Sequence, residues 1–279
     1  MTSDILESAV ERLRKAGIES PRLEARLMLA AAMGLTQEAV IAGAMPDAAQ
    51  LASFTAMLAR REAREPLAYI LGKREFWSLE FAVGPGALTP RPESETLIEA
   101  ALAEFPIADL PLRVLDLGTG TGCLLIAFLK ERPQAFGVGI DISEKALTWA
   151  RRNLGSHGMT NRARLSRADW TKGVEGAFDV ILCNPPYVAD AERASLAPEV
   201  ARHEPEMALA AGKDGLDAYR QLGPRIGAWL RPKARAFVEV GQGQAADVAA
   251  IFGESGLDVV SIVPDLAQIP RCLVVALRQ

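Results

Sequence analysis

The sequence is poor in the residues that bind metal ions or form disulfides. Its 279 residues include two histidines, His157 and His203, and three cysteines, Cys123, Cys183 and Cys272. The cysteines are odd in number, scattered and set in apolar runs, which predicts reduced core residues. Neither histidine stands at ligand spacing from a cysteine, so we expect no zinc site and no Cys–His catalytic pair.

The sequence shows no long apolar run, and we expect no leader. No stretch approaches the roughly 20 apolar residues that span a bilayer. The first seven residues are acidic and amphipathic, without the basic and then apolar segments of a secretory signal. We therefore expect a cytoplasmic protein with no membrane partner.

Neither sign of charge is in large excess. The 31 basic and 35 acidic residues give a net charge of -4, and ten of each sign lie before residue 79. This balance argues against a broad basic surface for nucleic acid. With 49% apolar residues, the chain is long enough to form a large core in one or two domains.

Residues 1–73 have the pattern of a helical domain. A serine and a proline at 20–21 place an N-cap residue and a first-turn proline before one helix. Asp47 and Gln50 have the spacing of a capping box before another. Alternating apolar residues then predict a β-hairpin connector over 74–88. The role of the helical domain is open between a packing appendage and substrate docking, of which we expect docking.

Residues 89–279 alternate strand and helix, a pattern typical of a parallel sheet covered on both faces. The fold class is therefore α/β with a Rossmann-like sheet. After the fourth of these strands, residues 188–215 form a long and irregular connection, and such connections are often functional. The expected strands lie at 114–117, 135–140, 164–166, 178–183, 236–240, 259–263 and 272–277.

A glycine-rich turn follows the first strand of this region. Glycine at alternate positions allows positive φ angles and a close approach of the backbone to a ligand. The G-x-G-x-G spacing differs from the G-x-G-x-x-G of dinucleotide folds, which favours a nucleotide-type cofactor other than NAD. The residues expected to bind it are Gly118, Thr119, Gly120, Thr121 and Gly122.

Two further side chains stand at strand ends on the cofactor side. Asp141 ends the second strand, where a carboxylate accepts both hydroxyls of a ribose. The alternative for Asp141 is an N-cap, a role that Ser143 can fill instead. Trp170 follows the third strand, where it either covers an adenine ring or belongs to the core.

The apolar strand at 178–183 runs directly into the turn Asn184-Pro185-Pro186-Tyr187. Two prolines stiffen the exit from the sheet and hold Asn184 at the strand's carboxyl end, where open α/β sheets bind ligands. The amide oxygen and the proline carbonyls accept hydrogen bonds, which suits a substrate NH2 group. The alternative reading is an ordinary turn after a buried strand. This edge of the sheet therefore offers sites for an adenosine and an NH2 group but no site for a pyrophosphate. S-adenosylmethionine fits that combination best.

With these residues the sequence resembles the class I S-adenosylmethionine-dependent methyltransferases. More closely, it resembles the HemK/PrmC family of glutamine N5-methyltransferases, which modify bacterial peptide chain release factors. The turn at 90–95 and the segment at 214–220 are specific to that family. The segments that carry the resemblance are 65–72, 90–95, 116–122, 184–187, 204–205, 208–209 and 214–220.

The resemblance implies a small helical domain before a seven-stranded, mostly parallel methyltransferase sheet. It places S-adenosylmethionine on residues 118–122, Asp141, Trp170 and Asn184, with no metal. It places the substrate glutamine on residues 184–187, and catalysis on Asn184, Pro185 and Tyr187. A release factor is the implied partner of a monomeric enzyme.

Three other functions stay open at this point. The related ribosomal-protein glutamine methyltransferases share much of the pattern, but their turn lacks the Arg-Pro-Glu seen at 91–93. A DNA or RNA exocyclic-amine methyltransferase shares the Asn-Pro-Pro-Tyr turn but needs phosphate contacts. A non-catalytic binding module is the third. Arg91 and Glu93 either face the cofactor pocket or form a surface pair.

Overall fold

The computed structural model describes residues 2–170 and 173–278. The chain divides into two compact units. Unit 1 comprises Met1–Lys73 and Ala197–His203, and unit 2 comprises Arg74–Leu196 and Glu204–Gln279.

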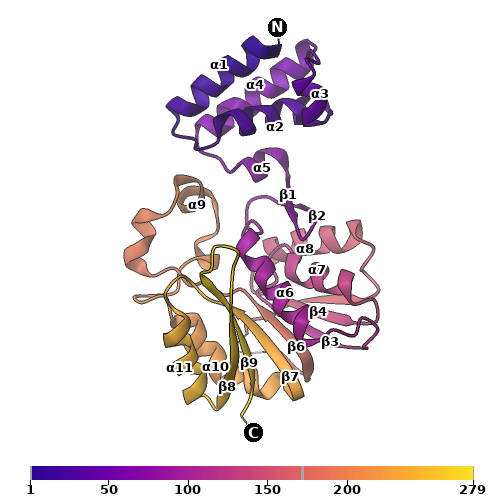
Figure 1. Cartoon of the computed structure of the whole chain (residues 1–279), viewed down its shortest axis with the longest axis vertical. Coiled ribbons are helices and arrows are strands. Elements are labelled where there is room, and N and C mark those ends of the chain that lie inside the picture. The colour runs from indigo at the N-terminus through magenta and orange to yellow at the C-terminus, as the bar shows by residue number, and fades with distance from the viewer. Residues whose placement is uncertain (1, 171–172, 279) are drawn as a thin grey trace. The chain divides into compact units, whose positions relative to one another are not determined.

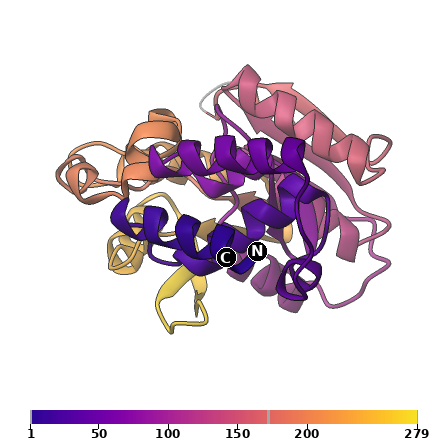
Figure 2. The ribbon, with the colours of Figure 1, turned by 90° about the horizontal axis from the view of Figure 1, so that it is seen from above.

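The N-terminal part of unit 1 is built from helices. The helices α1, α2 and α4 contact one another and lie side by side in Figures 1 and 2. Their shared core includes Leu13, Met28 and Leu29, which are fully buried. The helices are α1 (Thr2–Lys15), α2 (Pro21–Met33), α3 (Gln37–Ile41), α4 (Ala48–Glu62) and α5 (Leu67–Leu71).

The helix starts in unit 1 confirm one of the two predicted caps. Gln50 N donates to Asp47 Oδ1 over 2.8 Å and Asp47 N donates to Gln50 Oε1 over 2.9 Å, which completes the capping box. Pro21 is the first residue of α2, as expected, but the predicted Ser20 cap is wrong. Ser20 makes no side-chain capping bond, because its backbone, at φ -116° and ψ 57°, is not in the extended conformation usual for an N-cap.

A short helix from much later in the chain, α9 (Pro198–His203), completes unit 1. Its residue Glu199 accepts from Arg61 over 2.9 Å and from Arg64 over 2.7 Å. Arg61 is 5% exposed and also pairs with Glu24 over 2.5 Å. Two carboxylates and the Glu65 carbonyl thus satisfy a guanidinium that would be costly to bury alone.

Unit 2 contains a hairpin and a seven-stranded sheet. The hairpin pairs β1 (Lys73–Phe76) with β2 (Leu79–Ala82). The sheet has the order β5-β4-β3-β6-β7-β9-β8, in which β9 runs antiparallel to both neighbours and the other pairs are parallel. The predicted mostly parallel sheet is confirmed. Its strands are β3 (Arg113–Leu117), β4 (Phe136–Asp141), β5 (Ala163–Arg167), β6 (Phe178–Cys183), β7 (Leu230–Glu239), β8 (Leu257–Pro264) and β9 (Pro270–Leu277).

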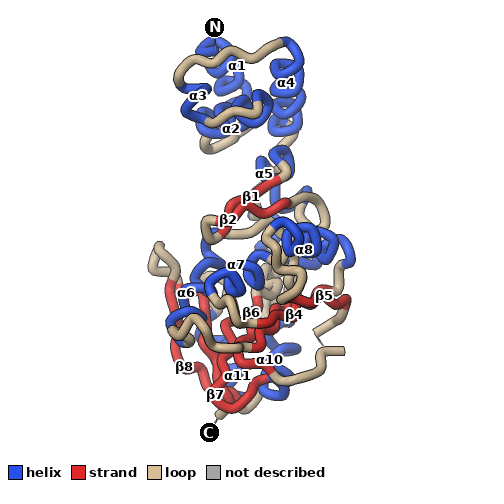
Figure 3. The backbone as a smooth tube through the Cα atoms, turned by 90° about the vertical axis from the view of Figure 1, so that its right-hand side faces the viewer, coloured by secondary structure: helices blue, strands red, loops and turns tan. Residues whose placement is uncertain are grey.

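Helices cover both faces of this sheet. In Figures 1 and 3, α6, α7 and α8 lie on one side of the strands and α10 and α11 on the other. Under α10 and α11 the core includes Phe178, Tyr219 and Phe252, which are all at most 1% exposed. This packing fixes the strand ends that carry the site. The helices are α6 (Glu95–Glu104), α7 (Cys123–Glu131), α8 (Glu144–Ser156), α10 (Asp217–Trp229) and α11 (Ala245–Glu254).

The segment at 188–215 is more ordered than its sequence predicts. It contains the 3-10 turns η2 (Asp190–Ser195) and η3 (Glu206–Ala208) besides α9. Val188 N donates to Leu209 O over 2.9 Å, and Ala211 N donates to Val188 O over 3.0 Å. The prediction of an irregular connection was therefore wrong, because short helices and a closed base order it.

The cysteines follow the sequence-based expectation. All three are free thiols, with Cys183 and Cys272 buried and Cys123 half-buried. Separately, within residues 2–170 and 173–278 no helix combines the length and the apolar character needed to cross a membrane.

Candidate active site

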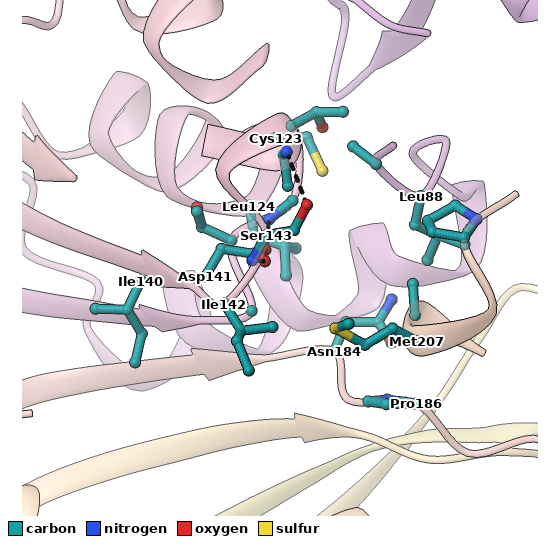
Figure 4. A pocket seen from close by; sticks show the side chains of 18 of the residues that line it. Leu88, Cys123, Leu124, Ile140, Asp141, Ile142, Ser143, Asn184, Pro186 and Met207 are labelled. Carbon is teal, nitrogen blue, oxygen red and sulfur yellow. Dashed lines mark hydrogen bonds between the residues drawn. The ribbon is translucent and has the colours of Figure 1, made fainter. Parts of the chain in front are cut away.

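A cavity of about 340 Å³ lies in unit 2 at the carboxyl end of the parallel strands (Figure 4). Its volume falls within the roughly 300–1,000 Å³ of small-molecule pockets. Residues that follow four adjacent strands line it: 118–121 after β3, 140–143 at the end of β4, 168–170 after β5, and Asn184 and Pro186 after β6. Ligands of open α/β sheets bind at this edge.

The cavity brings together most of the residues predicted from the sequence. Among the described residues that line it, Gly122, Pro185 and Tyr187 are not found. The predicted residues that do line it are Gly118, Thr119, Gly120, Thr121, Asp141, Trp170, Asn184 and Pro186.

The glycine turn has the backbone conformation that glycine permits. Gly118, Gly120 and Gly122 have φ angles of 71°, 56° and 81°, a region unfavourable for other residues. Gly122 directly precedes α7 as its N-cap residue, and a Cβ at this position would lie 3.4 Å from Ala150 Cβ. Gly122 therefore serves close helix packing, whereas Gly118 and Gly120 face the cavity.

A buried carboxylate beneath the turn holds it in place. Asp116 is fully buried at the centre of the sheet and accepts from Thr119 Oγ1 over 2.6 Å. Burial raises the pKa of Asp116 to about 7, against the opposing effect of the Thr119 bond. Asp116 thus orients the turn from below and is not among the described residues that line the cavity.

Asp141 links the glycine turn to the start of α8. Its Oδ2 accepts from Gly120 N over 2.9 Å and its Oδ1 from Ser143 N over 2.8 Å. Burial raises the pKa of Asp141, while these backbone bonds oppose the rise. Each carboxylate oxygen keeps a further lone pair for a ligand hydroxyl. The helix cap is Ser143, which accepts from Ala146 N over 3.2 Å.

Trp170 supplies a flat wall of the cavity. A Cβ added at Gly118 would lie 3.4 Å from its ring, so the ring and the glycine turn are in contact. The indole Nε1 donates to Gln221 Oε1 over 3.4 Å. The partly buried ring also packs on the core cluster, so Trp170 both belongs to the core edge and faces the ligand space.

Asn184 projects into the cavity (Figure 4) with a defined orientation. Its Nδ2 donates to Ser94 Oγ over 3.0 Å, and Ser94 Oγ donates to Glu239 Oε2 over 2.5 Å. With its nitrogen engaged, Asn184 offers its carbonyl oxygen to a ligand. Tyr187 donates to Glu239 Oε1 over 3.4 Å, and burial raises the pKa of Tyr187 far above its ordinary value, so the phenol stays protonated.

The structure decides the position of Arg91 and Glu93. Arg91 lines the cavity and pairs with Glu204 over 2.7 Å, whereas Glu93 is exposed. Glu204 is 8% exposed, and burial raises its pKa although Arg91 opposes the rise. Met207 of η3 is also part of the cavity wall.

Sequence reasoning missed Ser94 and Glu239 as site residues. Ser94 belongs to the turn at 90–95, whose pattern gives it no role of its own. Glu239 ends an apolar strand and is 1% exposed. An acidic residue at the carboxyl end of a buried strand is the pattern that could have identified it.

The donor set of the site suits an organic ligand. Among residues 2–170 and 173–278, no group of three or more His, Cys, Asp or Glu side chains is placed to hold a metal ion. The cavity instead offers backbone N–H groups, carboxylates, an amide and aromatic surface. This arrangement fits an adenosine with an attached polar tail.

Comparison with known proteins finds two family matches along the chain. Residues 4–72 match the family described as the PrmC N-terminal domain, and residues 95–213 match the methyltransferase small domain. The release factor glutamine methyltransferase of Rhodospirillum rubrum is 45% identical over 278 residues, which cover 98% of this chain and 84% of that protein. Its counterpart in Cereibacter sphaeroides is 46% identical over 267 residues, which cover 95% and 94%.

A solved structure shows the same fold. The crystal structure of ribosomal protein L11 methylase from Lactobacillus delbrueckii subsp. bulgaricus superposes with a TM-score of 0.51 at 20% identity. The match covers 71% of this chain and 84% of that one. It supports a class I methyltransferase fold.

Proposed function

Because this chain belongs to the release factor glutamine methyltransferase family, we propose that it methylates bacterial peptide chain release factors. The methyl group passes from S-adenosylmethionine to the side-chain nitrogen, N5, of the glutamine in the Gly-Gly-Gln motif. The observation that carries this proposal is Asn184, whose amide oxygen is free to accept in a cavity at the sheet's carboxyl edge.

The cofactor would occupy the cavity described above. When bound, S-adenosylmethionine supplies an electrophilic methyl group on a sulfonium. Residues 118–122 would hold it through the backbone, Asp141 would accept from the ribose hydroxyls, and Trp170 would cover the adenine. Asn184 would stand between cofactor and substrate.

The substrate glutamine would be held by acceptors alone. A carboxamide nitrogen is a poor nucleophile because its lone pair is delocalised into the carbonyl. Asn184 Oδ1 and the Pro185 carbonyl would accept its two N–H bonds, which aims the nitrogen at the methyl group and stabilises the positive charge that develops. Pro186 and Tyr187 would wall the slot for the flat amide, and the extra proton would leave to solvent.

The helical part of unit 1 would dock the release factor. Exposed apolar side chains support this role, because such side chains on a helical module suit a protein partner. A release factor substrate also implies action in the cytoplasm, and the family resemblance leads us to expect a monomer. The exposed apolar side chains are Leu23, Leu35, Ile41, Met45 and Leu51.

Mass analysis of the acceptor tests this function. Purified release factor is incubated with the protein and S-adenosylmethionine, beside duplex DNA and a ribosomal-protein fraction as parallel acceptors. One added methyl group on the Gly-Gly-Gln glutamine is the expected result. Methylation of DNA or a ribosomal protein, with none on the release factor, would overturn the substrate and keep the cofactor.

A pair of variants tests the role of Asn184. Asn184→Ala should lower turnover by roughly 10²-fold, the usual cost of removing one positioned transition-state hydrogen bond. Asn161→Ala removes an exposed amide from the turn before β5 and should leave turnover unchanged. Near-normal turnover in Asn184→Ala would contradict the proposed role.

A further inference from the structure

A buried carboxylate lies behind Asn184. Glu239 ends β7, is 1% exposed and is not among the described residues that line the cavity. Ser94 joins the two, since its Oγ lies 2.5 Å from Glu239 Oε2 and 3.0 Å from Asn184 Nδ2. One chain of hydrogen bonds therefore runs from the core to the cavity.

The hydrogen bond between Ser94 and Glu239 sets the direction of the one between Ser94 and Asn184. An ionised carboxylate only accepts, so the single hydrogen of Ser94 is directed to Glu239. Ser94 then presents only lone pairs to Asn184, and only the amide nitrogen can face them. A flipped Asn184 would place two acceptors about 3 Å apart and lose a hydrogen bond.

We propose that Glu239 is a positioning residue for methyl transfer, which acts through Ser94 to keep the oxygen of Asn184 directed at the substrate amide. This inference rests on the proposed function, because it deepens the role of Asn184 there. Glu239 itself touches neither substrate nor cofactor.

The surroundings of Glu239 show when this constraint operates. Burial raises the pKa of Glu239 to about 7, with Ser94 and Arg271 opposing the rise and Glu93 adding to it. Above that pH the carboxylate fixes Ser94 as a donor. Below it, a protonated Glu239 can donate to Ser94, and Ser94 can then donate to a flipped Asn184. The other titratable groups that interact with Glu239 are Tyr187, Tyr219, Cys123, Cys183 and Cys272.

A double-mutant cycle tests the chain of hydrogen bonds. At a pH well above 7, where Glu239 is ionised, the two carboxylates of Asn184→Asp compete for one Ser94 hydrogen, so turnover should fall by roughly 10²-fold. Adding Glu239→Gln supplies an N–H donor to Ser94, which releases the Ser94 hydrogen to the new carboxylate at position 184. Turnover should then recover by roughly tenfold, although Glu239→Gln alone lowers wild-type turnover a few-fold.

Two controls separate this coupling from general damage. Tyr219→Phe removes an equally buried hydroxyl that donates to the main-chain oxygen of Glu239 over 3.0 Å, and it should give no recovery with Asn184→Asp. In a Ser94→Ala background the recovery by Glu239→Gln should vanish. If Glu239→Gln lowers turnover by the same factor in the wild type and in Asn184→Asp, the proposal is wrong.

A pH profile keeps the test decisive if Asn184→Asp does not fold. Wild-type turnover at saturating substrate should fall a few-fold as pH drops through about 7, and Glu239→Gln should not show this fall. If the turnover of the wild type and that of Glu239→Gln change with pH in parallel, the proposal is overturned. If the wild type methylates a different acceptor, the proposed substrate fails, and the same cycle on that acceptor still tests Glu239.

Discussion

Arg91 and Glu204 form an ion pair beside the cavity, with Nη2 of Arg91 2.7 Å from Oε2 of Glu204. Arg91 belongs to the turn before α6, and Glu204 directly precedes Pro205, which lines the cavity. The pair thus joins two segments of unit 2 that are far apart in sequence. It gives the turn at 90–95 a structural role that the sequence left open.

Removing this pair should weaken both the fold and the site. Arg91→Ala leaves Glu204 buried without its cation, so unit 2 should lose roughly 2 kcal/mol of stability and the KM for substrate should rise. Tryptophan fluorescence is a suitable probe, because all four tryptophans lie after residue 73. Arg193→Ala breaks an exposed pair with Glu206 and should change stability by under about 0.5 kcal/mol. Equal losses in both variants would contradict this account.

The Asp141 carboxylate should be worth at least roughly tenfold in cofactor affinity. Asp141→Asn keeps the size but places an N–H group against the backbone donors of Gly120 or Ser143. It also removes one acceptor for the ribose, so the Kd for S-adenosylmethionine should rise roughly 30- to 100-fold. Calorimetric titration measures this change. The control is Glu144→Gln, which changes an exposed carboxylate in the first turn of α8. Comparable affinities for S-adenosylmethionine in the two variants would contradict the role of Asp141 in binding it.

A methyl group in the glycine turn should block the ligand more than it harms the fold. Gly120 has φ 56° and lines the cavity, while Gly158 has φ 67° and an added Cβ there would meet nothing within 4 Å. Both alanine variants should lose about 1 kcal/mol of stability from backbone strain. Only Gly120→Ala should also lose roughly tenfold or more in affinity for S-adenosylmethionine. Equal affinities in the two variants would show that the turn does not contact the cofactor.

Local pattern predicted the sheet well where a strand is short, apolar and flanked by turn residues. The strand at 178–183 has its predicted bounds in β6, between Gly176 and Pro185. The prediction failed at the start of β7, expected at 236 and found at Leu230. Pro232 argues against a strand at this point of the sequence, because proline is unfavourable inside a regular strand. The positive φ of Lys233 shows that β7 is irregular there.

Long-range contacts explain what the sequence could not show about the site and its surroundings. The helix α9 is held by Glu199 through Arg61 and Arg64, which lie far earlier in the chain. Ser94 and Glu239 are 145 positions apart, yet they share a hydrogen bond. The glycine turn and Asp141 were predictable because strand ends of a parallel sheet meet at one edge. Partners brought in by tertiary packing carry no such local pattern.

The buried Glu239 carboxyl should make stability fall as pH rises. Its folded pKa of about 7 lies above its ordinary value of 4.5. Between these values the unfolded chain releases the proton that the folded chain keeps, so rising pH favours unfolding until the group ionises in both states. Glu239→Gln lacks this effect. Its stability relative to wild type should therefore increase across that interval, by on the order of 3 kcal/mol, and stay level at higher pH. Urea unfolding followed by tryptophan fluorescence measures this difference in stability between the two proteins. The pKa of Asp116 is also raised to about 7, but its effect on stability is the same in both proteins and cancels. The exposed Glu144→Gln should show no such trend, and a pH-independent difference for Glu239→Gln would mean that Glu239 is ionised throughout.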